Sequence, residues 1–508
     1  MNLSKSRYCK GIQCPKMLWM DGNMPEQYDP SVMNDIVLMS GEIVGNTAKG
    51  YYGEYAEVPF SEDKSKMIAE TKRLMDMNTG IIAEASFYYD GNFCMVDILR
   101  LVDGGYEIIE VKSSSNSKGV KQIYFDELAY QLYVLSNCGV PVKSVFIMQI
   151  NSEYVRKGDL NIKELFILTD CSQKVFDAVG DVERKITEIK IIAAQKDEPE
   201  SYFGERCNKP YKCGYKEWCY SKLPKNNIFD IGWGMYTKKK ETAYKDGVVT
   251  FADVLNSTIE VNEQQRLQVK TVVHDLPPSI DKNRVSDFIS RITYPLYHLD
   301  FETFQQAIPL WDDISPYTHI PFQFSIHLQN EPCGDTTHKE FLAKEGIDPR
   351  RELAERICTD IPMNVCIIAY NMFFEKGVIA KLAELYPDLS EHLLNLNDNM
   401  IDLALIFKNG AYYCREMRGS YSIKSVLPAL FPNDPELNYD NLDIIRDGND
   451  VMTVYPTLHE QTPDYIKEVR KALLDYCKLD TLAMVKILGK LYEVVGDKYN
   501  ANEDFVND

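Results

Sequence analysis

Acidic and basic side chains converge on two neighbouring predicted strands near residue 100. The segment FCMVDILRLVDGGYEIIEVKSSS predicts a hairpin with the two-residue turn Asp103-Gly104. In that register Asp97 lies opposite Glu110, and opposed residues share a face with Cβ atoms about 5 Å apart. Lys112 is two residues beyond Glu110 and lies on the same face. Two carboxylates and an ammonium suit metal-dependent phosphodiester cleavage. A surface hairpin with a cross-strand salt bridge is the alternative.

A second pair of acids opens the last third of the chain. Asp300 and Glu302 are two residues apart on an apolar predicted strand and point the same way. Two acids on one face of a core strand lower stability unless they are paired or hold a metal. Glu375 follows on a predicted helix. Tyr476 and Asp480 are four residues apart and share a face of another helix. These residues form a candidate two-cation site, although each piece alone is common.

Four cysteines make a third candidate site. Cys207, Cys213 and Cys219 are spaced by five intervening residues, and Cys14 lies far upstream. Four thiolates suit a [4Fe–4S] cluster or a zinc ion. Cysteines that pack as small hydrophobic residues are a poor explanation for three within thirteen residues among Lys, Tyr and Gly. Cys9 is the chief rival of Cys14 as the fourth ligand.

Basic and aromatic residues alternate around these cysteines. They are Arg206, Tyr211, Lys209, Lys212, Tyr215, Lys216 and Trp218. Phosphate attraction combined with base stacking suits single-stranded DNA. A solvated loop with packed aromatic side chains is the alternative.

The first constellation resembles the PD-(D/E)XK nuclease core of RecB-like exonucleases. In that family a Gln-centred helix follows the E-x-K strand, and Gln131 has the matching place. The resemblance implies that Lys112 and Gln131 are catalytic and that Asp97 and Glu110 are metal ligands for Mg²⁺ or Mn²⁺. It also implies DNA as the substrate.

Two departures from that family stand out. The histidine that many members use as an upstream ligand is absent, and Glu42 is the candidate replacement. Leu135 stands where a tyrosine often follows the Gln.

The order of one cysteine before the core and three after it resembles the iron–sulfur subclass of RecB-like nucleases. This order implies that a [4Fe–4S] cluster, with zinc as the alternative, joins the two ends of the domain. Its ligands would be Cys14, Cys207, Cys213 and Cys219.

Taken in order, the acids of the last third resemble those of the DEDD family of 3′→5′ exonucleases, which have a ribonuclease-H-like fold. Because of Tyr476, the resemblance is to the tyrosine subtype of that family. The resemblance implies that two Mg²⁺ or Mn²⁺ ions are held by Asp300, Glu302, Glu375 and Asp480. Tyr476 would orient the attacking water. Glu375 departs from the aspartate that is usual in the family.

Further residues are candidates for supporting roles in this second module. Asp402 lies on an apolar segment and is either a supporting acid or a structural residue. The segment RGSYSIKSVLPALFP resembles a helix of the same exonucleases, so Arg418, Tyr421 and Lys424 are candidates for substrate contact. The phrases PFQFSIH, RGSYSIKSVLPAL and YCKLDTLAM look like a bacterial two-module family of unknown function.

The elements that position these residues divide the chain into four parts. We expect an α/β fold with a PD-(D/E)XK core and a ribonuclease-H-like domain joined by a mostly helical connector. The expected ranges are 1–225 for the first module, 226–290 for the connector, 291–495 for the second module and 496–508 for an acidic tail. No phosphate-binding loop of an ATP-driven motor is present in the sequence.

The composition limits the cellular compartment and the binding partners that we expect. The 508 residues include 13 cysteines, and neither a secretory leader nor an apolar stretch of about 18 residues is present, so we expect a cytoplasmic protein with no membrane partner. The net charge of −20 opposes nucleic-acid binding through a basic face. Bound cations would offset the acids of the two constellations, so binding through metals and small basic patches stays open.

These observations predict a metal-dependent nuclease, an exonuclease acting on single-stranded or end-containing DNA. A nucleic-acid-binding scaffold with one or both modules inactive is the main alternative. A metal-dependent phosphatase or nucleotidase acting on small molecules is the third.

Overall fold

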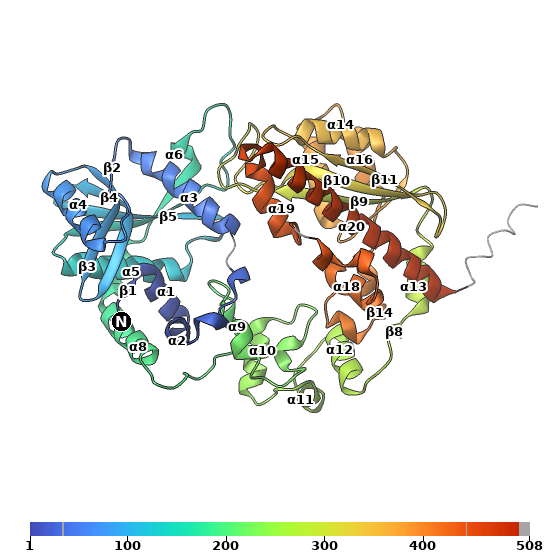
Figure 1. Cartoon of the computed structure of the whole chain (residues 1–508), viewed down its shortest axis with the longest axis horizontal. Coiled ribbons are helices and arrows are strands. Elements are labelled where there is room, and N and C mark those ends of the chain that lie inside the picture. The colour runs from blue at the N-terminus through green and yellow to red at the C-terminus, as the bar shows by residue number, and fades with distance from the viewer. Residues whose placement is uncertain (33–34, 443, 497–508) are drawn as a thin grey trace, which may run out of the picture. The chain divides into compact units, whose positions relative to one another are not determined.

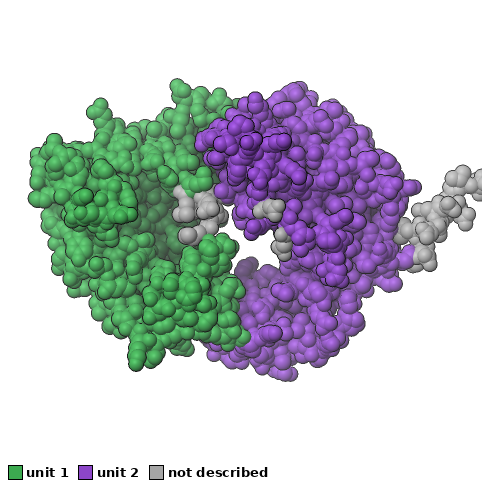
Figure 2. Space-filling view, viewed as in Figure 1, with its two compact units in different colours: residues 1–223, 306–318 green, residues 224–305, 319–508 purple. Residues whose placement is uncertain are grey.

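The computed structural model describes residues 1–32, 35–442 and 444–496, which fold as two compact units of mixed α/β structure (Figures 1 and 2). Unit 1 comprises residues 1–223 and 306–318, and unit 2 comprises the rest of the described chain. The expected acidic tail lies, apart from Gly496, outside the described residues. No helix in the described ranges is both long and apolar enough to cross a membrane.

Unit 1 is built on a seven-stranded mixed sheet in the order β2-β3-β4-β5-β6-β7, with β1 parallel to β4. Strands β5 and β6 are parallel and are joined through α5 (Gln122–Asn137), whereas β3, β4 and β5 form an antiparallel meander. The strands are β1 (Leu3–Ser4), β2 (Ala56–Glu57), β3 (Ile81–Tyr89), β4 (Asn92–Val102), β5 (Gly105–Ser115), β6 (Val142–Ile150) and β7 (Phe166–Asp170).

Both faces of this sheet are covered, because alternate residues of a strand point to opposite faces. Ile108 packs with Tyr8 of α1 and Leu128 of α5, while Ile109 packs with Val44 of α3. The other helices of unit 1 are α1 (Lys5–Gln13), α2 (Pro15–Asn23), α3 (Asp35–Lys49), α4 (Lys64–Asp76), α6 (Ile162–Leu165), α7 (Ser172–Ala178), α8 (Val182–Ala193) and α9 (Lys216–Tyr220).

Residues 306–318 lie inside the range expected for the second module but belong to unit 1. Ala307 and Ile308 pack against the face of the sheet that Val44 covers. The Tyr317 hydroxyl donates to the Ser113 carbonyl. The excursion contains no helix or strand, so no periodic pattern marks it in the sequence.

Unit 2 contains a five-stranded sheet in the order β11-β10-β9-β12-β13. Strands β9, β10 and β11 are antiparallel, and β12 and β13 run parallel to β9. The strands are β9 (Leu296–Phe304), β10 (Ile320–Gln329), β11 (Thr336–Leu342), β12 (Cys366–Ala369) and β13 (Met400–Asp402); β8 (Ser279–Ile280) and β14 (Tyr412–Tyr413) form a separate pair.

Helices cover both faces of this sheet (Figure 1). Leu299 and Phe301 of β9 pack with Leu353 of α14 and Val378 of α15, so the intervening residues of β9 face the long helix α20. The helices are α14 (Arg350–Asp360), α15 (Phe373–Leu385), α16 (Ser390–Asp398), α17 (Ala404–Lys408), α18 (Ile423–Leu430), α19 (Gly448–Val454) and α20 (Pro463–Val495).

The segment expected as a connector folds into helices that have an apolar cluster of their own. Ile228, Phe251 and Val269 are buried together there. The segment belongs to unit 2. Its helices are α10 (Thr237–Lys245), α11 (Phe251–Asn256), α12 (Glu263–Val273) and α13 (Lys282–Ile289).

Three histidines form a row across β9, β10 and β11. His298 pairs with His327, which pairs with His338. His327 is 3% exposed, and its Nδ1 lies 2.8 Å from the Thr481 hydroxyl of α20. The neighbouring Ser325 hydroxyl lies 2.7 Å from the same Thr481 hydroxyl. This polar network attaches α20 to the sheet beside Asp480.

We expect the histidine row to make unit 2 less stable in acid. Burial, together with the nearby charges of His338 and His298, lowers the pKa of His327 from 6.5 to about 3. As the pH falls, His327 binds a proton in the unfolded state before it does so in the folded state. The free energy of unfolding therefore falls as the pH drops from about 7 towards the pKa of folded His327, by about 1.4 kcal/mol for each pKa unit. Denaturant melts of wild type and His327→Gln measure this, and equal pH slopes would contradict the prediction.

Candidate active sites

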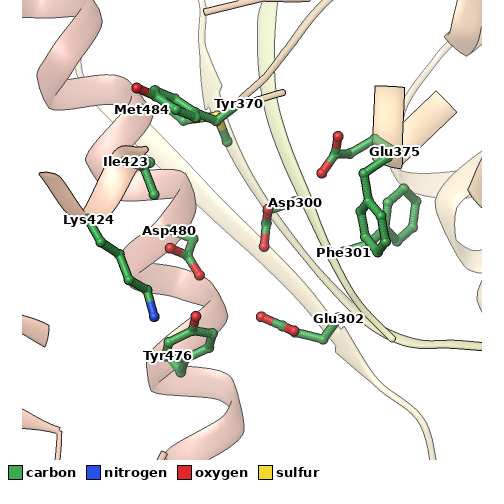
Figure 3. Close-up of a pocket in the computed structure, with 11 residues that line it drawn as sticks. Asp300, Phe301, Glu302, Tyr370, Glu375, Ile423, Lys424, Tyr476, Asp480 and Met484 are labelled. Atoms are coloured by element: carbon green, nitrogen blue, oxygen red, sulfur yellow. The ribbon is translucent and has the colours of Figure 1, made fainter. Parts of the chain in front are cut away.

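Unit 2 contains a cavity of about 190 Å³ into which carboxylates project from three elements. Figure 3 shows Asp300 and Glu302 from β9, Glu375 from α15 and Asp480 from α20 pointing into it. The two strand residues share a face because they are two apart. The structure therefore brings together all four acids expected at this site.

These four carboxyl groups are protonated more readily than ordinary acids. Burial raises the pKa of Asp300 and Glu302 well above their usual values, and the charges of neighbouring acids add to the effect. Burial also raises the pKa of Asp480 to about 6 and that of Glu375 to about 8. Glu375 is 3% exposed, and its Oε2 has no hydrogen-bond partner among the described residues. Such a donor set fits divalent cations, which would satisfy the oxygen atoms and offset the charge.

Tyr476 and Lys424 line the same cavity (Figure 3). The Lys424 Nζ lies 5.1 Å from the ring centroids of Tyr476 and Tyr439. It also donates to the Arg446 carbonyl at 3.0 Å, which fixes its direction. The positive charge of Lys424 lowers the pKa of both Glu302 and Asp480, partly opposing the effect of burial.

Asp402 lies next to this site without lining the cavity. Its Oδ1 accepts hydrogen bonds from the backbone N–H groups of Asn371 at 2.9 Å and Ala404 at 3.0 Å. Asn371 has a left-handed backbone with φ of 69°, directly before the helix that carries Glu375. These hydrogen bonds stabilise the turn before the helix that carries Glu375.

Two residues at this site were not expected from the sequence. Tyr439 donates its hydroxyl to Asp480 Oδ1 at 2.5 Å. Cys477 is fully buried, and its Sγ lies 3.7 Å from Asp300 Oδ2. Cys477 is three residues before Asp480 on one helix, a spacing that predicts a shared face. No periodic pattern connects Tyr439 to the site.

Cation binding at this cavity is expected to release protons. Carboxyl groups with a raised pKa, such as Glu375 at about 8, must ionise before they can bind a cation. The apparent affinity for Mn²⁺ should therefore rise with pH between 6 and 8, about tenfold per pH unit for each proton released. Calorimetric titrations in buffers of different ionisation enthalpy count these protons. An affinity independent of pH would contradict the expectation.

The first constellation lies on β4 and β5 of unit 1, in the predicted register, with Val102 opposite Gly105. Glu110 Oε1 accepts from Lys112 Nζ at 2.7 Å, and its Oε2 accepts from Gln131 Nε2 at 2.6 Å. Asp97 Oδ2 accepts from the backbone N–H of Val111 at 2.8 Å. The structure thus brings Lys112, Glu110 and Gln131 into direct contact.

Lys5 and Glu127 join this group and were not expected. Lys5 Nζ lies 2.8 Å from Glu110 Oε1, 3.6 Å from Asp97 Oδ1 and 3.5 Å from Glu127 Oε1. Glu127 Oε2 also accepts from Lys112 at 2.7 Å. Glu127 is four residues before Gln131 on α5, so its position could have been found from helical spacing. Lys5 is 105 residues from Glu110 and has no such signal.

The two lysines reverse the effect of burial on Glu110. Burial by itself would raise the pKa of Glu110, but Lys112 and Lys5 lower it well below its ordinary value. Asp97 has a pKa raised to about 6 by burial and by the charge of Glu110, although both lysines oppose the rise. Glu110 is therefore ionised at neutral pH.

Glu42 lies on α3 and lines a second cavity of unit 1, of about 220 Å³, together with Asp97 and Glu84. Glu84 lies across from Asp97 between the pairs Ala83–Ile98 and Ala85–Val96, and its φ of 59° is unusual for a strand residue. Lys49 lies 3.4 Å from Glu84 Oε1. Asp97 thus connects the lysine-containing group to the cavity that Glu42 lines.

The four expected cysteines line one small cavity of unit 1: Cys14, Cys207, Cys213 and Cys219. All four are described, and no three of their sulfur atoms lie within 4.8 Å of one another. Four thiolates that line one cavity suit a [4Fe–4S] cluster or a zinc ion.

Cys9 lies elsewhere. It packs against the main core of unit 1, and its pKa is raised by burial and then by the charge of Glu127. Cys9 is therefore beside the carboxylate group, and Cys14 is the N-terminal cysteine that accompanies the other three. Gln13 joins the two segments because its Nε2 donates to the carbonyls of Arg206 at 2.7 Å and Tyr211 at 2.8 Å.

The aromatic residues between the cysteines differ in exposure. Tyr215 is buried and donates to Asp21 Oδ1 at 2.7 Å, and Trp218 Nε1 donates to Glu198 Oε1 at 3.2 Å. Tyr211 is 51% exposed. Of these three aromatic side chains, Tyr211 alone presents a large surface for base stacking.

Comparisons with known proteins give a partial match. A family model described as a domain of unknown function (DUF2779) matches residues 297–422, which contain Asp300, Glu302 and Glu375. The uncharacterized protein UU173 of Ureaplasma parvum serovar 3 (strain ATCC 700970) is 28% identical over 168 residues, which cover 30% of this chain and 24% of that protein. The chain thus spans about a quarter of the length of the curated relative that it matches. No solved structure matches.

Proposed function

We propose that the chain is a metal-dependent nuclease with two active modules, a DEDD-type exonuclease in unit 2 and a RecB-like PD-(D/E)XK nuclease in unit 1. The observation that carries the proposal is the group of four carboxylates around the unit 2 cavity, with Glu375 Oε2 buried and without a partner in the described structure. A purely structural role for four acids whose pKa values are all raised by burial would be costly. The mixed five-stranded sheet that carries them supports a ribonuclease-H-like fold.

In unit 2 the residues Asp300, Glu302, Glu375 and Asp480 would hold Mg²⁺ or Mn²⁺. These cations, when bound, supply Lewis acidity and a nucleophilic water for phosphodiester cleavage. Tyr476 has a pKa raised far above its usual value, first by burial, so its hydroxyl keeps its proton and can orient a water. Tyr439 fixes one oxygen of Asp480, and Lys424 offers an ammonium to the substrate phosphate.

In unit 1 Asp97 and Glu110 would take part in cation binding, with Glu42 as a further ligand from the neighbouring cavity. The Lys112 ammonium is anchored between Glu110 and Glu127 at 2.7 Å from each. Such an anchored charge can steady an incoming hydroxyl or a developing negative charge. Gln131 fixes the second oxygen of Glu110.

The cysteines would hold a [4Fe–4S] cluster with a structural role. Cys14 lies before strands β2 to β7 of unit 1, and the other three cysteines lie after them, so a shared cluster would join both ends of the domain. Free thiols of this kind need a reducing compartment, and the cytoplasm is part of the proposal. Zinc held by the same four thiolates is the alternative.

Labelled single- and double-stranded DNA and RNA, incubated with Mn²⁺, test the proposal. The variants are Asp300→Ala, Lys112→Ala and their combination. We expect digestion of DNA with free ends by the wild type, a partial loss in each single variant and a complete loss in the double variant. Unchanged Mn²⁺-dependent digestion by the double variant would refute it. Activity on mononucleotides alone would indicate a phosphatase.

A nucleic-acid-binding scaffold with an inactive unit 1 is the second candidate. The observation that favours it is that Lys5, Lys112 and Gln131 together occupy both oxygens of Glu110. A scaffold would retain nucleic acid in binding assays while Lys112→Ala left the cleavage pattern unchanged.

A further inference from the structure

Lys5 is bound to a nearly fully buried carboxylate, that of Glu110. Its Nζ lies 2.8 Å from Oε1 and 3.0 Å from Oε2 of that carboxylate. An ammonium has three donors, so two are used on Glu110. Asp97 and Glu127 lie 3.6 and 3.5 Å away, too far for a normal hydrogen bond. Lys5 therefore bonds directly to Glu110 and forms longer ion pairs with Asp97 and Glu127, which places its ammonium among three carboxylates.

The backbone around Lys5 is fixed on both sides. Leu3 and Ser4 pair with Asn92 and Phe93 of β4, the strand that also carries Asp97. The Ser4 hydroxyl then caps α1, which begins at Lys5. A lysine side chain loses rotamer entropy when it is ordered. Here the strand pairing places its Cα beside the site, so part of the ordering is already done by the fold.

The helix that begins at Lys5 is also held by close packing. Tyr8 stacks on Tyr130 of α5 with ring centroids 4.6 Å apart. A Cβ at Gly11 would lie 2.7 Å from Ile189 Cγ2, so only glycine fits this approach of α1 to α8. Lys5 thus projects from a rigid element into the carboxylate group, as active-site residues generally do.

Charge distinguishes the two sites. The group in unit 1 has three carboxylates, Asp97, Glu110 and Glu127, and two ammonium groups, whereas the cavity of unit 2 has four carboxylates and the single ammonium of Lys424. An ammonium at the centre of the unit 1 group repels a second divalent cation from the same carboxylates. It also favours the negative charge of a phosphodiester.

We propose that Lys5 is a catalytic residue of unit 1 that binds the substrate phosphate in place of a second cation, so that unit 1 uses one divalent cation. This inference rests on the proposed nuclease function of unit 1. The ligand class is a nucleic-acid phosphodiester, and the contact is made by the ammonium of Lys5. Lys112 remains the second ammonium of the site.

The test uses the full chain with Asp300→Asn, so that only unit 1 cleaves. On this background Lys5→Ala should lower Mn²⁺-dependent cleavage by about 10²–10³-fold. Lys5→Arg, which keeps the charge, should restore part of the rate. Lys10→Ala is the matched control, because Lys10 lies on the same helix and pairs with Asp21 at 2.5 Å away from the site. The control should retain the parent rate.

Metal titration separates catalysis from mere stabilisation. Lys5→Ala should bind Mn²⁺ more tightly than the parent, because a positive charge has been removed from beside the ligands. Adding Asp97→Asn should remove one bound ion. Three results would each overturn the role of Lys5. They are equal or faster cleavage by Lys5→Ala, weaker Mn²⁺ binding by Lys5→Ala, and the loss of two bound ions when Asp97→Asn is added. A parent chain that does not cleave would instead refute the nuclease function of unit 1.

Discussion

Asp300→Asn should abolish cleavage by unit 2, lowering kcat by about 10³-fold or more. Asp300 lies at the centre of the cavity (Figure 3), and its carboxyl group interacts with those of Asp480, Glu302 and Glu375. An amide of the same size removes the negative charge that a cation needs while preserving the packing. Cleavage of end-labelled DNA on a Lys112→Ala background, where unit 1 is inactive, measures the loss.

The same variant should have the opposite effect on the stability of the metal-free protein. Because Asp300 and its neighbours repel one another when ionised, Asp300→Asn should raise the Tm without Mn²⁺. It should also remove most of the rise that Mn²⁺ gives the wild type, since a ligand that binds only the folded state stabilises it. Retained Mn²⁺ stabilisation would contradict the assignment of Asp300 as a ligand.

Asp360→Asn is the matched control. Asp360 is a buried acid of the same unit, paired with Arg356 at 2.6 Å and with Lys339 at 3.4 Å. Its replacement should destabilise unit 2, because two cations lose a partner. It should leave the Mn²⁺ affinity and the cleavage rate of the folded protein unchanged.

Cys213→Ser should remove the cluster and destabilise unit 1. The cluster would join Cys14 to cysteines roughly 200 residues later, and a cross-link that closes a loop of this size contributes on the order of 4–5 kcal/mol. The anaerobically purified wild type should be brown and contain iron and sulfide, and the variant should be colourless with a lower Tm. Tight zinc in a colourless wild type would contradict the iron–sulfur assignment.

Cys9→Ser and Cys14→Ser form a matched pair for this prediction. Cys9 lies beside Glu127, and Cys14 lines the cavity of the other three cysteines. Cys14→Ser should therefore lose the cluster, and Cys9→Ser should keep it. The reverse result would show that the N-terminal ligand is wrongly assigned.

The sequence determined the parts of each site that lie on one element or one turn. The period of two along a strand placed Asp300 beside Glu302, and the two-residue turn at Asp103-Gly104 set the register of the first hairpin. The helical period placed Tyr476 on the face of Asp480. These inferences succeeded because local backbone geometry alone decides which neighbouring side chains share a face.

The α/β character of both units was also predictable, since it follows from the alternation of apolar strands and amphipathic helices. The residue bounds of the two units were harder to predict. Residues 306–318 have no regular pattern, and their place in unit 1 depends on burying Ala307 and Ile308 against a sheet formed by other parts of the chain.

Only the tertiary structure decided which distant residues complete the sites. Lys5 and Tyr439 reach carboxylates 105 and 41 residues away, and a contact at such separation leaves no periodic trace because it depends on how whole elements pack. The same packing placed Cys14, and not Cys9, in the cavity of the other three cysteines and placed Asp402 at the turn before α15. Local spacing therefore determined the types of chemistry that this chain can support, and packing decided which charges surround each reactive group.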